Sequence, residues 1–84
     1  MHDTSDLFPQ HTTTLDVRPD LARGDEPFER IIRTAVSIAP GDELMLVAPF
    51  EPVPLYAVLQ GYGFTHQAER RAADEWVVTF TRQA

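Results

Sequence analysis

The chain has 84 residues, a net charge of −6 from 13 acidic residues against 7 arginines, and neither cysteine nor lysine. This length predicts one domain of modest stability, because such a chain buries only about 60% of the surface of its unfolded form. The missing thiols exclude disulfides, thiolate metal sites and thiol chemistry within the chain, and the acidic balance argues against nucleic acids and anionic membranes as partners.

No segment of the sequence suggests insertion into a membrane or export across one. No apolar run approaches the ~20 residues that span a bilayer. The first residues lack the basic and then apolar regions of a signal peptide. Because the absence of cysteine also fits a reducing compartment, we expect a cytoplasmic protein.

The three histidines do not form a recognisable metal site. Residues 1–11 show no hydrophobic periodicity, so we expect a flexible lead-in before a single domain over residues 12–84. His2 and His11 belong to this lead-in, and spacing places no third ligand beside them. His66 is interpreted as a half-buried strand residue. We therefore predict no metal site and no cofactor.

The first half of the domain predicts a strand and a helix. Residues 12–17 are short and β-branched, which is typical of a strand, and residues 18–23 predict a loop whose Leu21 covers one end of the core. Residues 24–39 predict a helix with one apolar face, because apolar residues recur there at helical spacing: Phe28, Ile31, Ile32, Ala35 and Val36. A tight turn with positive φ at Gly41 is expected to follow.

The second half predicts a strand, a helix and a hairpin. Residues 43–48 are apolar on both faces, which indicates a central strand parallel to the first. Prolines delay the second helix until Val53 or Pro54, and Gly61 and Gly63 end it. Residues 64–69 and 76–81 predict the two strands of a hairpin, joined by a polar loop over residues 70–75.

The order β-α-β-α-β-β predicts the fold class. Two amphipathic helices and one sheet bury their apolar faces only against each other. We expect an α+β fold, a two-layer sandwich with two helices packed on one face of a four-stranded mixed sheet. Its core is expected to include Phe28, Ile32, Leu46, Leu55, Leu59 and Val78.

Several short motifs resemble the TusA-like (SirA-like) sulfur-carrier superfamily over about residues 13–82. They are Leu15-Asp16-Val17-Arg18, Glu26-Pro27, Pro40-Gly41-Asp42 and the terminal hairpin. In that superfamily, a Cys-Pro-x-Pro motif begins the first helix and its cysteine carries a persulfide. Gly24 stands where that cysteine would be and Asp25 where the first proline would be. Because glycine has no nucleophile, persulfide transfer by this route is excluded.

A closer resemblance is to the cysteine-less branch, a bacterial family of unknown function, DUF2249. Glu51-Pro52, Pro54-Leu55-Tyr56 and Gly61-x-Gly63-Phe64 carry it. Members often have a histidine-containing stretch before the second helix, where this chain has Pro49-Phe50-Glu51-Pro52, so no role of that histidine transfers. The resemblance also implies an association with hemerythrin-like proteins, and hence with redox or nitrogen-oxide metabolism.

Two helix starts are the candidate functional surface. Arg23, Gly24, Asp25, Glu26 and Pro27 precede or begin the first helix, and Glu51 and Pro52 precede the second. Capping and interaction with the helix dipole explain the carboxylates at both places. We therefore predict no catalytic residue, and a small non-enzymatic module that binds a protein partner or a small ligand. The alternative is an accessory factor in sulfur or redox metabolism that works without a thiol.

The helix-free face of the sheet is a second candidate surface. An antiparallel sheet with one wet face normally alternates apolar and polar residues, yet residues 44–47 are apolar on both faces. Met45 and Val77 are therefore expected to belong to an interaction face that docks a partner or a second copy, as a weak homodimer. The opposing interpretation is a monomer in which long polar side chains cover the patch.

Overall fold

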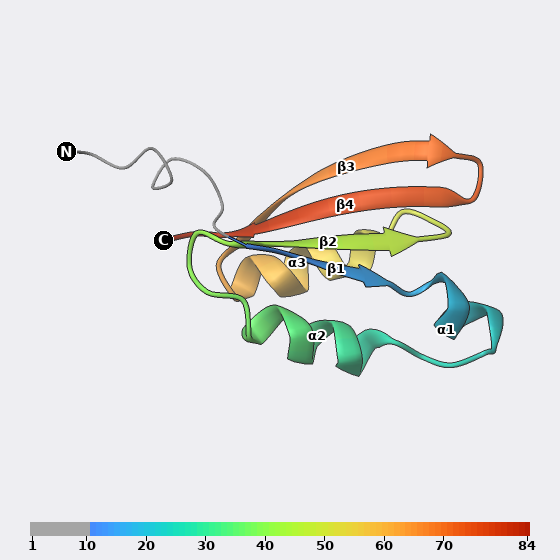
Figure 1. Cartoon of the computed structure of the whole chain (residues 1–84), viewed down its shortest axis with the longest axis horizontal. Coiled ribbons are helices and arrows are strands. Elements are labelled where there is room, and N and C mark those ends of the chain that lie inside the picture. Colours follow the sequence, from blue (N-terminus) through green and yellow to red (C-terminus); the bar gives the residue numbers. More distant parts are fainter. Residues whose placement is uncertain (1–10) are drawn as a thin grey trace.

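The computed structural model of the protein describes residues 11–84. Most of the predicted lead-in, including His2, lies outside the described residues. The elements follow the chain as β1 (Thr12–Asp16), α1 (Arg18–Ala22), α2 (Phe28–Val36), β2 (Glu43–Ala48), α3 (Val53–Gly61), β3 (Phe64–Ala72) and β4 (Glu75–Arg82). Figure 1 shows how they are arranged in space.

The four strands form one mixed sheet in the order β1-β2-β4-β3. β1 runs parallel to β2, and β4 runs antiparallel to both β2 and β3. Residues of α2 and α3 share one buried cluster with alternate residues of β2 and β4, so both helices cover the same face of the sheet. The predicted fold class, a two-layer α+β sandwich, is confirmed.

The core forms because β2 and β4 each send alternate side chains toward the helices. Leu44 lies opposite Phe80, and Leu46 lies opposite Val78. These four side chains pack with helix residues in a single cluster, whose other members include Ile31, Ala35, Leu55 and Leu59. Of the predicted core residues, Leu46, Leu55, Leu59 and Val78 are buried.

The predicted orientation of α2 is wrong for two of its residues. Phe28 is 42% exposed and Ile32 is only half-buried, whereas Ile31 is 3% exposed and Ala35 is fully buried. The apolar stripe of the sequence is wider than the face of the helix that contacts the sheet. Ile31 and Ala35 of the helix, together with Ile38 just after its end, pack in the core. Phe28 is therefore left at the margin of the helix layer.

A short helix, α1, replaces part of the predicted loop over residues 18–23. Pro19 fits a first helical turn, where no backbone N–H is needed. An Asp16 carboxylate oxygen accepts the backbone N–H of Arg18 at 3.0 Å, and the Leu21 N–H bonds to the Val17 carbonyl at 3.1 Å. Pro19, which lies in the predicted loop, therefore begins a helical turn.

The end of α2 also differs from the prediction, which extended the helix to residue 39. The helix stops at Val36, and the N–H groups of Ser37 and Ile38 bond to carbonyls three residues earlier, which tightens the last turn. Arg82 donates from Nη1 to the Ile38 carbonyl at 2.6 Å. Gly41 has φ +89°, as the turn prediction requires.

The C-terminal hairpin is longer than predicted. β3 continues to Ala72 and β4 begins at Glu75, with a register shift between Arg70 and Ala72. The predicted loop over residues 70–75 therefore shrinks to a tight connection. Such an irregularity near the end of an edge strand weakens further strand pairing.

The burial of α2 generates a stability prediction. Ile31→Ala should lower the free energy of unfolding by about 2–5 kcal/mol, because it leaves a cavity under the helix. Ile32→Ala, on the same helix but half-buried, is the matched control and should cost less. Urea denaturation of both variants measures the difference. Equal losses would contradict the observed orientation of α2.

Candidate functional site

An apolar groove lies between the beginnings of α2 and α3, above the carboxyl ends of β1 and β2. Its volume is about 140 Å³. The lining side chains are almost all apolar and come from five successive parts of the chain: Val17, Leu21, Glu26, Pro27, Phe28, Ile31, Leu46, Ala48, Phe50, Pro52, Pro54 and Leu55. The two predicted helix starts therefore meet at one place.

Prolines shape the walls of the groove. Pro27 and Pro52 are buried, and each stands immediately before a helix as its N-cap. Pro54 lies in the first turn of α3. Because proline fixes φ, these segments lose little conformational freedom when the groove is occupied. Two aromatic side chains stand at its margin, Phe28 at 42% and Phe50 at 54% exposure.

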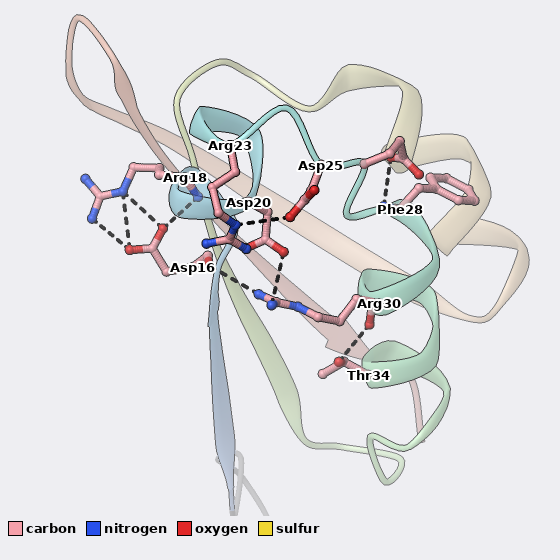
Figure 2. Close-up of polar contacts among 9 residues, drawn as sticks. Asp16, Arg18, Asp20, Arg23, Asp25, Phe28, Arg30 and Thr34 are labelled. Carbon is pink, nitrogen blue, oxygen red and sulfur yellow. Dashed lines mark hydrogen bonds and ion pairs between the residues drawn. The ribbon is translucent and has the colours of Figure 1, made fainter.

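A polar junction holds the segment that leads into α2 (Figure 2). Arg30 Nη1 lies 3.1 Å from Asp20 Oδ2, and Arg30 Nη2 donates to the Asp16 carbonyl at 3.3 Å. Asp20 is 7% exposed, so its carboxylate needs this partner. The Asp25 N–H also bonds to the Asp20 carbonyl at 2.9 Å. These contacts fix the start of α2 against α1 and the end of β1.

The turn before α2 has a left-handed backbone. Gly24 has φ +82°, a conformation that disfavours any L side chain, although a Cβ would meet no atom within 4 Å. Arg23 pairs with Asp25 at 3.1 Å beside it. The position that corresponds to a cysteine in the superfamily resemblance therefore carries both a different residue and a backbone suited to glycine.

The two glutamates at the helix starts, Glu26 and Glu51, have separate hydrogen-bond partners. Glu26 Oε1 accepts the backbone N–H of Phe28 at 2.8 Å, so this carboxylate caps α2 as expected. Glu51 Oε2 accepts the hydroxyl of Tyr56 at 2.9 Å, a contact that the sequence did not indicate. Burial, with the carboxylate of Glu51 as the second cause, raises the pKa of Tyr56 to about 12.

Tyr56 also stacks on His66. The ring centroids are 3.7 Å apart and the rings are inclined by 12°. Tyr56 is half-buried against the core, whereas His66, which was predicted to be half-buried, is exposed on β3. Their spacing in the sequence contains no signal for this contact, because it depends on how α3 lies over the edge strand.

The structure offers few ligands for a metal ion. Within residues 11–84, no group of three or more His, Asp or Glu residues is placed to hold one. His11 and His66 both belong to this part of the chain. In the same part, none of the helices has both the length and the apolar character needed to cross a bilayer.

The helix-free face of the sheet is mostly polar. Met45 and Val77 both lie on it, since they alternate with the core residues of β2 and β4. Met45 is half-buried and Val77 is 4% exposed. Val77 has Val47 and Glu69 as its cross-strand neighbours. Docking on this face, including weak dimerisation, stays a prediction, with Met45 as its more accessible residue.

Comparison with known proteins gives one match. The family model described as "Uncharacterized conserved protein (DUF2249)" matches residues 14–82. No curated protein and no solved structure matches the chain. The matched range contains both helix starts and the whole groove.

The ion pair of Arg30 generates a prediction about stability. Arg30→Met should lower the free energy of unfolding by about 1–3 kcal/mol, because the Asp20 carboxylate then loses its closer charged partner and keeps only Arg23, at 4.0 Å. Asp20→Asn in the same background should restore part of the loss. Arg33→Met, which removes only an exposed pair with Glu29, is the control and should change stability little in thermal denaturation. Equal effects of the two arginine variants would contradict this role.

The environment of Tyr56 generates a prediction about pH. In Tyr62→Phe, where Tyr56 is the remaining tyrosine, phenolate absorbance of the folded protein should titrate near the pKa of about 12. The unfolded chain should titrate near ~10. Because the folded pKa is the higher, the stability that Tyr56 contributes is complete below pH ~10 and is lost as the pH rises through the folded pKa.

Glu51→Gln tests the second cause of this shift, the carboxylate beside the phenol. In the Tyr62→Phe background it should lower the midpoint, because it removes a negative charge beside the phenol while keeping an oxygen acceptor. Circular dichroism at each pH shows whether the protein is folded. If Tyr56 titrated near ~10 in the folded Tyr62→Phe protein with Glu51 present, this result would contradict the environment described for Tyr56.

Proposed function

The chain belongs to the DUF2249 family of uncharacterized conserved proteins, and we propose that it is a small non-enzymatic binding module that holds an apolar side chain of another protein in the groove between α2 and α3. The single observation that carries this proposal is the groove itself. Its walls are apolar, and two exposed aromatic side chains flank it.

The volume of the groove fits a single apolar side chain of a partner, which would anchor it. A cavity of ~150 Å³ with apolar walls accepts a benzene-sized molecule, and this groove measures about 140 Å³. It therefore suits one aromatic or large aliphatic side chain. Protein interfaces commonly depend on such an anchor, which supplies most of the binding energy from a desolvated pocket.

The distribution of exposed apolar residues supports this location. Phe28 and Phe50 line the groove, and both are exposed. Clustered exposed apolar residues mark interaction sites more reliably than single ones. The alternative, an accessory role in sulfur or redox metabolism, rests on the family resemblance and concerns the metabolic process in which the protein takes part. Such a role is compatible with a partner side chain bound in the groove.

Selection from a random peptide library tests the proposal. The protein, immobilised through its C-terminus, should enrich peptides that share one aromatic or large aliphatic residue. Phe28→Ser with Phe50→Ser should weaken the selected peptides by about 10- to 100-fold, because the two rings contribute ~1.5–3 kcal/mol of apolar contact.

Val36→Ser with Val58→Ser is the matched control. Both residues are exposed and neither lines the groove, so the selected peptides should bind this variant normally. Failure to enrich any apolar residue would overturn the proposed function. Equal weakening by the control pair would place the binding surface elsewhere.

A further inference from the structure

We propose that the occupant of the groove is a basic segment of a partner protein, in which arginine or lysine residues flank the apolar anchor and one of them faces the carboxylate of Glu26. This inference rests on the proposed function of the groove and adds the chemistry of the partner. Its basis is the charge around an otherwise apolar site.

The polar side chain that lines the groove is an acid. Glu26 contributes Oε1 to the backbone of Phe28, and within residues 11–84 no arginine or histidine forms an ion pair with it. Glu51 does not line the groove, because its carboxylate accepts the hydroxyl of Tyr56, whose ring stacks on His66. By contrast, Asp25 is neutralised by Arg23 at 3.1 Å.

The net charge of the protein also favours a basic partner. At −6 the chain attracts a basic partner at long range and repels an acidic one. Complementary charge raises association rates and selects among partners that carry the same apolar anchor. A basic segment with an apolar anchor therefore complements both the apolar walls of the groove and the Glu26 carboxylate among them.

A second copy of the chain fits less well as the occupant. It carries the same charge of −6 and is repelled.

Three blocked peptides test the proposal on the full chain. They are Gly-Arg-Phe-Arg-Gly, Gly-Glu-Phe-Glu-Gly and Gly-Arg-Ser-Arg-Gly, each acetylated and amidated. Amide shifts of Ile31, Ala48 and Leu55 in nuclear magnetic resonance titrations report occupation of the groove. We expect the first peptide to bind at least fivefold more tightly than the second, and the third to leave these amides unshifted.

Glu26→Gln locates the charge effect. The amide oxygen of glutamine still accepts the Phe28 N–H, so the start of α2 is preserved while the charge is removed. This variant should weaken the Arg-Phe-Arg peptide about two- to fivefold, the range of an exposed ion pair. Glu29→Gln removes an equal charge from the same helix, at a side chain 88% exposed, and should leave binding unchanged. High salt should weaken the wild-type preference.

The outcomes separate the two proposals. Equal binding of the Arg and Glu peptides at the groove, or equal effects of the two glutamine variants, would overturn the basic partner and leave the apolar groove standing. Equal shifts from the Ser and Phe peptides would overturn the apolar anchor and with it the proposed function. Absence of groove shifts with all three peptides would overturn both.

Discussion

The ion pair between Asp20 and Arg30 is the interaction on which the rest of the site depends. The carboxylate is almost completely buried, and the guanidinium reaches it from α2 at 3.1 Å while also bonding to the Asp16 carbonyl. A buried carboxylate without such a partner carries a large desolvation cost. Because the pair spans the end of β1, α1 and α2 (Figure 2), it fixes where α2 begins, and one wall of the groove follows from that position.

The segments that line the groove have a restricted backbone conformation. Pro27 and Pro52 precede the two helices, and Pro54 lies in the first turn of α3. Fixed φ angles reduce the entropy lost on binding, so a preorganised pocket holds a ligand more tightly than a flexible one of equal area. A domain of this size buries little apolar surface, so the packing of its core contributes little to keeping a flexible pocket in one conformation. The proline-rich segments supply that order locally.

The sequence predicted what depends on local chemistry. The bounds of β2 and α3, the hairpin and the positive φ at Gly41 follow from apolar patterning, proline and glycine. The predictions failed where several local solutions existed. Pro19 suits both a strand break and a first helical turn, and the wide apolar stripe of α2 allowed two orientations, one with Phe28 inside.

Contacts between segments that are distant in the chain could not be predicted from the sequence. Periodicity placed Glu26 and Glu51 at two helix starts, but only the packing of α2 and α3 on one face brings these starts to a common groove. The stack of Tyr56 on His66 likewise depends on how a helix crosses an edge strand. Such pairs are set by tertiary geometry, which a single sequence pattern does not encode.

The exposure of Phe28 and Phe50 distinguishes the groove from the other candidate surface. On the helix-free face, Val77 is 4% exposed and Met45 is half-buried. The groove departs from the ordinary distribution, because two large aromatic residues remain in water beside an apolar cavity. Local departures from good packing are expected where a surface serves a function. The orientation of α2 leaves Phe28 at the margin of the helix layer, and a side chain bound in the groove would remove this ring and that of Phe50 from water.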